Sequence, residues 1–125
     1  MITYNNKQYN CPMEMTLDLI GGKWKALIMW QLSLRVLRFN ELRRLFPDVT
    51  QKMLTQQLRD LEHNGLISRK IYHQVPPKVE YALTDFGKTL MPVLIQMNQW
   101  GADYAAGQAE QAEEHSNPAD IDAVS

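Results

Sequence analysis

Apolar residues recur at helical spacing in several stretches of the chain, and turn-forming residues separate these stretches. After Cys11-Pro12, where the proline suits the first position of a helix, the spacing predicts a helix that ends at Gly21-Gly22. A second helix is predicted from Trp24 to Leu34, and we expect it to be central because it is apolar on most faces. Residues 1–10 contain few apolar side chains and are expected either to be mobile or to form an N-terminal arm.

The next two predicted helices are joined by a turn of a few residues. The first covers residues 38–46 and is ended by Pro47-Asp48-Val49. Thr50 is a good N-cap for the second, which runs to about Asn64 and stops at Gly65. Two helices joined in this way predict a helix-turn-helix.

After this pair the apolar pattern changes to a period of two residues, which is typical of strands. Residues 67–72 and residues 79–83 both alternate in this way. The segment between them contains Pro76-Pro77, which cannot continue a strand ladder. The pattern therefore predicts a β-hairpin with a proline-bearing tip, the wing of a winged helix.

A last helix is predicted to begin after Thr84, to kink or break at Pro92, and to reach Tyr104. Residues 105–125 contain no aromatic side chain and are acidic, so we expect them to form a disordered tail. The predicted fold class is mainly α with a small β-hairpin, which is a winged helix-turn-helix domain over residues 11–104.

The charge distribution changes this picture more than the composition does. A chain of 125 residues that is 45% hydrophobic allows one domain with one core. The net charge is −1, but residues 23–88 carry 12 Lys and Arg against 6 Asp and Glu, whereas residues 89–125 carry 6 Asp and Glu and no Lys or Arg. A basic centre favours a nucleic-acid partner.

Three features indicate a reducing compartment without membrane contact. The first ten residues lack the apolar region of a signal peptide, and the longest apolar run, Ala26–Trp30, is too short to span a bilayer. Cys11 is the only cysteine, so no internal disulfide can form. We therefore expect a cytoplasmic protein.

The helix that follows Thr50 has two different faces on a wheel of about 100° per residue. Leucines on one side anchor the helix to a core, namely Leu54, Leu58 and Leu61. The other side carries amides, a hydroxyl and cations without a carboxylate: Gln51, Lys52, Thr55, Gln56 and Arg59. Asp60 and Glu62 fall at other angles. Any solvated helix face is polar, but the position between a short helix and a wing favours contact with base edges in the major groove.

Other groups are candidates for phosphate contacts. Thr50 lies at a helix N-terminus, where free N–H groups bind phosphate. Arg43 and Arg44 lie on the first helix of the pair, which crosses the DNA backbone in helix-turn-helix proteins. In the wing we favour Lys78 at the tip, followed by Arg69, although each of these cations could equally be a solvated charge.

These residues match a known family in their order along the chain. The motifs CP at 11, GGKW at 21, RFNEL at 38 and TQKMLTQQLRDLE at 50 resemble the HxlR-type transcriptional regulators, relatives of the MarR group. GLI at 65, PPKVEY at 76 and LTDFG at 83 continue a resemblance that covers residues 11–101. One departure is residues 33–37, where relatives usually have a glycine-containing turn, so the end of the preceding helix stays open.

The resemblance implies a homodimer built by N- and C-terminal helices that flank the winged helix. Such a dimer reads a pseudo-palindromic operator in double-stranded DNA and represses or activates nearby genes, in response to an effector that the resemblance does not name. The candidate interface combines the first helix with the apolar stripe of the last: Met13, Leu17, Leu90, Leu94, Met97, Trp100 and Tyr104.

In several similar regulators the cysteine before this proline senses oxidants or electrophiles, which makes Cys11 a candidate redox sensor. The dipole and the free N–H groups of a helix N-terminus attract a thiolate, whereas Glu14, one turn later, opposes this attraction. The alternative is an inert cysteine that caps the helix or fills apolar space. A dimer also brings two copies of Cys11 into one molecule, which allows an intersubunit disulfide.

Enzymatic activity is not expected. His63, His73 and His115 are scattered without metal-ligand spacing, and the sequence contains no Ser-His-Asp or Cys-His motif, so neither a metal nor a cofactor is predicted. The remaining alternative is a winged-helix module that binds only protein, through the apolar stripe of residues 90–104. A DNA-binding regulator is the interpretation that the pattern favours.

Overall fold

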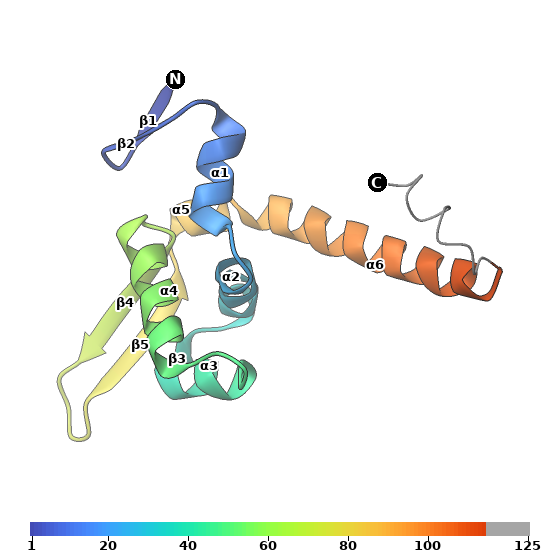
Figure 1. Ribbon diagram of the computed structural model, residues 1–125. Helices are drawn as coiled ribbons and strands as arrows, with labels where there is room; N and C mark the ends of the chain where they lie inside the picture. The colour runs from blue at the N-terminus through green and yellow to red at the C-terminus, as the bar shows by residue number, and fades with distance from the viewer. Residues whose placement is uncertain (115–125) are drawn as a thin grey trace. The chain divides into compact units, whose positions relative to one another are not determined.

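The computed structural model describes residues 1–114, with the side chains of residues 1–107. Its internal contacts divide the chain into two units, Met1–Met91 and the segment from Pro92 onward. The elements follow the chain in this order (Figure 1): β1 (Ile2–Tyr4), β2 (Lys7–Tyr9), α1 (Pro12–Ile20), α2 (Trp24–Leu34), β3 (Leu37–Arg38), α3 (Phe39–Leu45), α4 (Gln51–His63), β4 (Ile67–Tyr72), β5 (Lys78–Leu83), α5 (Asp85–Lys88) and α6 (Met91–Glu114).

The predicted helices are present, and local residues set their ends. α1 has Pro12 at its first position, where the missing N–H of a proline costs no helical hydrogen bond. α4 is capped by Thr50, whose Oγ1 accepts a hydrogen bond from the N–H of Met53 at 3.0 Å. Gly65 follows α4 in the left-handed region, with a φ of 76°. The helix-turn-helix of α3 and α4 is therefore confirmed.

The core of the first unit lies between α2, α4 and the three-stranded sheet. Ile28 and Met29 of α2 are fully buried, as are Leu54 and Leu61 of α4. Leu58, on the same side of α4, is 2% exposed. These leucines confirm the predicted inner face of α4, so the opposite face of this helix is directed to solvent.

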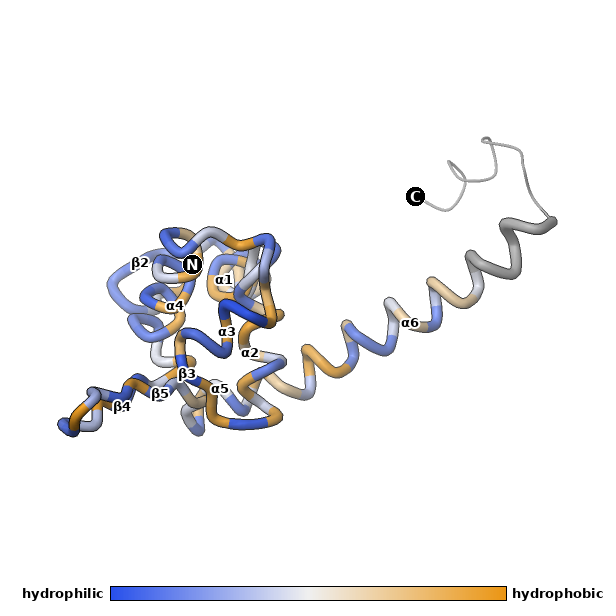
Figure 2. Tube along the Cα trace, turned by 90° about the horizontal axis from the view of Figure 1, so that it is seen from below, coloured by the Kyte–Doolittle hydropathy of each residue, from blue (hydrophilic) through white to orange (hydrophobic). Residues whose placement is uncertain are grey.

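The sheet has the antiparallel strand order β3–β5–β4. β4 and β5 pair from Ile67 opposite Leu83 to Tyr72 opposite Lys78, and they extend as a hairpin away from the helices of the first unit in both Figure 1 and Figure 2. The predicted wing is therefore confirmed. The sequence pattern did not predict β3, whose Leu37 is fully buried opposite Tyr81. β3 contains only one buried residue, which is too few to form the alternating apolar pattern that predicts a strand.

The N-terminal residues form an ordered hairpin, so the expectation that they are mobile was wrong. β1 and β2 pair antiparallel, from Ile2 opposite Tyr9 to Tyr4 opposite Lys7. Asn5 and Asn6 make the turn with φ values of 53° and 65°, a conformation that asparagine tolerates better than most residues. The hairpin was not predicted because the segment has few apolar residues and its turn at Asn5-Asn6 is short.

Two tyrosines attach this hairpin to the rest of the first unit. Tyr9 is 4% exposed, and its hydroxyl donates a hydrogen bond to Asp18 Oδ2 of α1 at 2.6 Å. The hydroxyl of Tyr4 donates to the carbonyl oxygen of Asn64, at the end of α4, at 2.5 Å. The ring of Tyr4 also stacks on Phe86 at a centroid distance of 5.9 Å. The hairpin therefore connects α1 with the C-terminal end of α4.

The last helical region is divided as expected, but the break lies at residues 89–90, before Pro92. α5 ends at Lys88 and α6 begins at Met91, so that Pro92 lies in the first turn of α6, where proline is tolerated. Hydrophobic residues recur between hydrophilic ones along α6 (Figure 2). The helix continues past Tyr104 to Glu114, so residues 105–114 of the predicted tail are helical. The remainder of the predicted tail, residues 115–125, lies outside the described residues.

None of the helices described within residues 1–114 combines the length and the apolar character that are needed to cross a membrane.

Candidate DNA-binding surface

The outer side of α4 presents the side chains that the helical wheel selected. They line one open hollow on the surface of the first unit, which we call the α4 face: Gln51, Lys52, Thr55, Gln56 and Arg59. Thr55 is half-buried and the other members are exposed. The α4 face therefore offers hydrogen-bond donors and acceptors of the kinds that pair with base edges, on a helix that the core holds in place.

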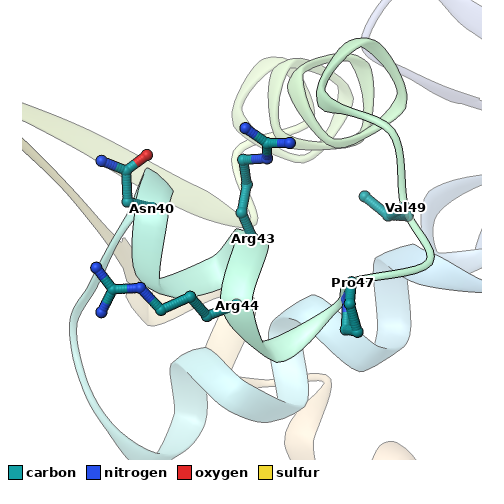
Figure 3. Close-up of a pocket in the computed structure, with 5 residues that line it drawn as sticks. All are labelled: Asn40, Arg43, Arg44, Pro47 and Val49. Carbon is teal, nitrogen blue, oxygen red and sulfur yellow. The ribbon is translucent and has the colours of Figure 1, made fainter.

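α3 brings two arginines close to the α4 face. Arg43 and Arg44 line a second open hollow with Asn40, Pro47 and Val49 (Figure 3). Arg43 points toward α4, and its Nη1 lies 3.5 Å from Oε1 of Gln51. Arg44 points away from α4. Both arginines are exposed, so the structure joins Arg43 to the α4 face and leaves Arg44 beside it.

In the wing, the structure places Lys78 next to the tip, directly after the loop of residues 73–77. Lys78 is the first residue of β5, and its Nζ lies 4.5 Å from the ring centroid of Tyr72 and 3.9 Å from Oε2 of Glu80. Its side chain is 24% exposed. The packing against Tyr72 and the ion pair leave Lys78 less available than expected, whereas Arg69 is exposed on β4.

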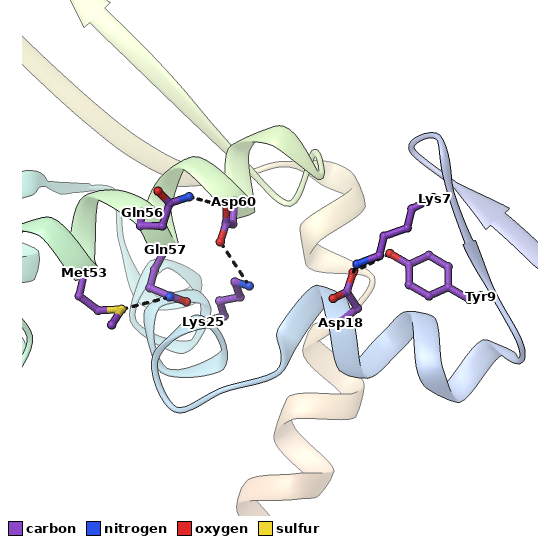
Figure 4. A network of polar contacts seen from close by, with 8 residues as sticks. All are labelled: Lys7, Tyr9, Asp18, Lys25, Met53, Gln56, Gln57 and Asp60. Atoms are coloured by element: carbon purple, nitrogen blue, oxygen red, sulfur yellow. Dashed lines mark hydrogen bonds and ion pairs between the residues drawn. The ribbon is translucent and has the colours of Figure 1, made fainter.

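A carboxylate that the helical wheel had set aside lies at the edge of the α4 face. Nε2 of Gln56 donates a hydrogen bond to Oδ1 of Asp60 at 2.9 Å, and Oδ2 of Asp60 lies 3.5 Å from Nζ of Lys25 (Figure 4). Gln56 and Asp60 are four residues apart, which is about 40° on a helical wheel, so their side chains are neighbours on the helix surface. The α4 face itself contains no carboxylate, but its edge does. Lys25 belongs to α2, and its role was not visible in the sequence.

A second polar network lies between β2 and α1. Asp18 Oδ2 accepts hydrogen bonds from the Tyr9 hydroxyl and from Nζ of Lys7, the latter at 3.1 Å (Figure 4). Because the carboxylate holds the phenolic proton, the pKa of Tyr9 is raised to about 12. The hydrogen bond from Tyr9, followed by the one from Lys7, holds the pKa of Asp18 below its usual value. This network fixes the hairpin on α1 and contains no residue of the α4 face.

The candidate interface residues divide by exposure. In the single chain the exposed ones are Met13 (65%), Leu17 (59%), Met97 (54%), Trp100 (67%) and Tyr104 (42%). Leu90 is half-buried, and Leu94 is 3% exposed, so the burial of Leu94 does not support its assignment to a contact with a partner.

Cys11 is exposed and lies directly before α1, in extended conformation with φ −155° and ψ 162°. Its side chain makes no capping hydrogen bond. The thiol of Cys11 is therefore accessible to a reagent in the single chain. Cys11 is neither buried nor a side-chain cap of α1, as the alternative interpretation had required.

Within the part of the chain that the structure describes, no three His, Cys, Asp or Glu side chains lie close enough together to hold a metal ion.

The sequence model of the HxlR-like helix-turn-helix family matches residues 19–109, which include α2, the helix-turn-helix and the wing. The chain belongs to this family. Among the relatives of this HxlR-like protein, the uncharacterized HTH-type transcriptional regulator YybR of Bacillus subtilis is 56% identical over 98 residues, which are 78% of each chain. Winged helix-turn-helix is therefore the fold, and transcription regulation, a role without catalysis, is the function of the family.

Solved structures resemble this HxlR-like protein at similar identity. The redox regulator HypR in its oxidized form is 56% identical, with a TM-score of 0.72, and the match covers 74% of this chain and 96% of that one. HypR in its reduced form is 51% identical, with a TM-score of 0.76, over 80% of this chain and 99% of that one.

Proposed function

We propose that this protein is a transcriptional regulator that binds double-stranded DNA sequence-specifically as a homodimer. The observation that carries the proposal is the α4 face, a set of amide, hydroxyl and cationic side chains on a helix whose inner leucines are buried. Arg59 can bridge O6 and N7 of guanine, and Gln51 and Gln56 can contact adenine. Thr55 and Lys52 can contact bases or the adjacent backbone.

The groups around the α4 face are suited to phosphate contacts. Arg43 lies beside the face, Arg44 borders it, and Thr50 begins the helix whose free N–H groups point along its axis. Arg69 is an exposed cation of β4, while Lys78 would have to leave Glu80 to reach DNA. Phosphate contacts of this kind position a protein on the duplex, and base contacts supply its specificity.

Two exposed apolar areas support the homodimer. Met13 and Leu17 of α1 form one, and Met97, Trp100 and Tyr104 of α6 form the other. The rings of Trp100 and Tyr104 stack at a centroid distance of 5.1 Å. Large apolar side chains that are exposed together favour a protein contact. A two-fold dimer would place two copies of α4 in successive major grooves, about 34 Å apart.

The test is a binding titration on duplex DNA from the region that flanks the protein's own gene, repeated at several salt concentrations. A random duplex of the same length is the matched control. We expect affinity for the flanking duplex to exceed affinity for the control and to fall steeply with salt, because phosphate contacts release counterions. Nuclease protection should show two half-sites about one helical turn apart. Absence of binding to either duplex at low salt would contradict the proposal and favour a module that binds only protein.

We also propose that Cys11 makes this regulation sensitive to oxidants or electrophiles. The exposure of its thiol at the start of α1 supports this, and the similar protein HypR is described as a redox regulator. The test compares the DNA affinity of the wild type and of Cys11→Ser before and after treatment with diamide. We expect diamide to change the affinity of the wild type only. An equal change in both proteins would end the proposal without affecting DNA binding itself.

A further inference from the structure

Gln56, a member of the α4 face, is held in one orientation by a neighbour outside that face. A glutamine amide normally presents a carbonyl oxygen or an NH2 group with equal ease, because its two ends differ little in size. Here Nε2 of Gln56 donates to Oδ1 of Asp60 at 2.9 Å. A carboxylate accepts hydrogen bonds and does not donate them, so only the NH2 end of the amide can face Asp60. Oε1 of Gln56 therefore points away from Asp60, as Figure 4 shows.

Asp60 in turn forms an ion pair with Lys25 of α2. Nζ of Lys25 lies 3.5 Å from Oδ2 of Asp60, so the two carboxylate oxygens have different partners. The side chain of Lys25 is 16% exposed and that of Asp60 is 37% exposed. The cation also balances the negative charge of Asp60 at the edge of a surface that would meet phosphates. Lys25, Asp60 and Gln56 thus form a chain of contacts that leads from α2 to the α4 face.

The other glutamines of α4 lack this arrangement. Oε1 of Gln51 lies 3.5 Å from Nη1 of Arg43, at the outer limit of a hydrogen bond between two exposed side chains. Gln51 can therefore present either end of its amide. Gln57 points to a different side of the helix, where Nε2 contacts Sδ of Met53 at 3.5 Å. Gln56 is the glutamine of the α4 face whose carboxylate neighbour fixes its polarity.

We propose that Asp60, supported by Lys25, is a positioning residue that makes Gln56 present its carbonyl oxygen to DNA. An outward acceptor pairs with an exocyclic amino group in the major groove, which adenine offers at N6 and cytosine at N4. Guanine and thymine offer acceptors there, O6 and N7 or O4, which repel the oxygen of Gln56. The protein therefore prefers adenine or cytosine at the base that Gln56 contacts. This inference rests on the proposed function, because it assumes that the α4 face reads bases.

The test is selection of bound duplexes from a library with a randomised segment, followed by sequencing of the selected pools. The wild type, Gln56→Ala and Asp60→Ala are compared, with Gln57→Ala as the matched control on the other side of the helix. In the wild-type pool we expect one position of each half-site to favour adenine or cytosine about three- to tenfold, the effect of one hydrogen bond. Gln56→Ala should lose the preference at that position alone, and Gln57→Ala should keep the wild-type pattern.

Asp60→Ala should still select the same half-sites but should accept guanine or thymine at the Gln56 position, because its Gln56 amide can turn over. Asp60→Asn keeps the size of the side chain and guards against a folding defect; its amide can accept or donate, so we expect it to relax the same position. Unchanged preference in both Asp60 variants would overturn the inference, as would a uniform loss of affinity without a change of preference. If the wild type selects no duplex, the proposed function itself fails.

Discussion

Replacing Thr84 by valine should destabilise the first unit by removing two hydrogen bonds while keeping the shape of the side chain. Oγ1 of Thr84 donates to the carbonyl oxygen of Gly65 at 2.5 Å and accepts from the N–H of Gly87 at 2.9 Å. Both contacts are partly buried. Gly65 follows the C-cap of α4, and Gly87 lies in α5, so this one hydroxyl joins the segment after α4 to the start of α5.

The expected magnitude follows from the two bonds. Loss of the N-cap bond to Gly87 costs about 1 kcal/mol. The carbonyl oxygen of Gly65 loses its side-chain donor in a partly buried position, which costs about 1 kcal/mol more. We therefore expect Thr84→Val to lower the free energy of unfolding by about 2 kcal/mol, which moves the urea midpoint by about 1 M for a chain of this size. Circular dichroism at one fixed protein concentration measures this, because association with a partner would also change the midpoint.

Two variants separate hydrogen bonding from packing. Thr84→Ser keeps the hydroxyl and should lose less than about 1 kcal/mol, since serine is also a good N-cap. Thr89→Val removes an exposed hydrogen bond to the carbonyl oxygen of Phe86, which water can replace, and should cost about 0.5 kcal/mol or less. A Thr84→Val protein as stable as Thr89→Val would refute the reasoning.

Of four further predictions, two concern the N-terminal hairpin, one concerns α5 and one concerns the dimer. Stability should fall as the pH rises from about 10 to about 12, because the folded state still holds the Tyr9 proton that the unfolded chain releases near its ordinary pKa, and Tyr9→Phe should lack this contribution. Because folding lowers the pKa of Asp18, the carboxylate contributes its full share of the stability above the usual Asp pKa of about 3.9, and this share is lost as the pH falls below that value. Asp18→Asn should not show this acid loss. Urea unfolding at stepped pH measures both the acid and the alkaline effect. Gly87→Ala should lower the free energy of unfolding by about 2 kcal/mol or more, because an added Cβ collides with the carbonyl oxygen of Leu66. Leu17→Glu should shift sedimentation equilibrium from dimer to monomer, because it places a charge on an exposed apolar area of α1.

Matched variants control these predictions. An added Cβ at Gly101 meets no atom within 4 Å, so Gly101→Ala should be neutral or stabilise the protein by up to about 1 kcal/mol. Equal effects of the two glycine substitutions would contradict the close contact at Gly87. Val36 is 50% exposed outside the predicted interface, so Val36→Glu should leave the dimer intact. If Val36→Glu and Leu17→Glu dissociate the dimer equally, the assignment of α1 to the dimer interface is wrong. The prediction for alkaline pH is wrong if Tyr9→Phe and the wild type lose stability in parallel above pH 10.

The sequence predicted the elements whose signals are local. Thr50 and Gly65 delimit α4 by their own capping preferences, and the leucine spacing of this helix identifies its inner face. The outer face followed from the same periodicity. Proline and the period-two pattern identified the wing in the same local way.

The features that the sequence concealed depend on contacts between distant segments. Tyr4 is anchored by a carbonyl at the end of α4, sixty residues later, so nothing near the N-terminus indicates an ordered hairpin. Lys25 reaches Asp60 only because α2 packs against α4. The packing of Lys78 against Tyr72 near the tip of the wing follows from the pairing register of β4 and β5, which alternation alone does not determine.

The central claim is that the α4 face reads DNA, and the dissociation constant of Arg59→Ala tests it most directly. The measurement uses a duplex selected by the wild type, with Lys88→Ala as the control cation outside that face, where Lys88 pairs with Asp85. Loss of one bidentate base contact should weaken binding of Arg59→Ala about 5- to 150-fold and relax preference at one base, whereas Lys88→Ala should bind within about twofold of the wild type. Wild-type affinity and base preference in Arg59→Ala would contradict the claim.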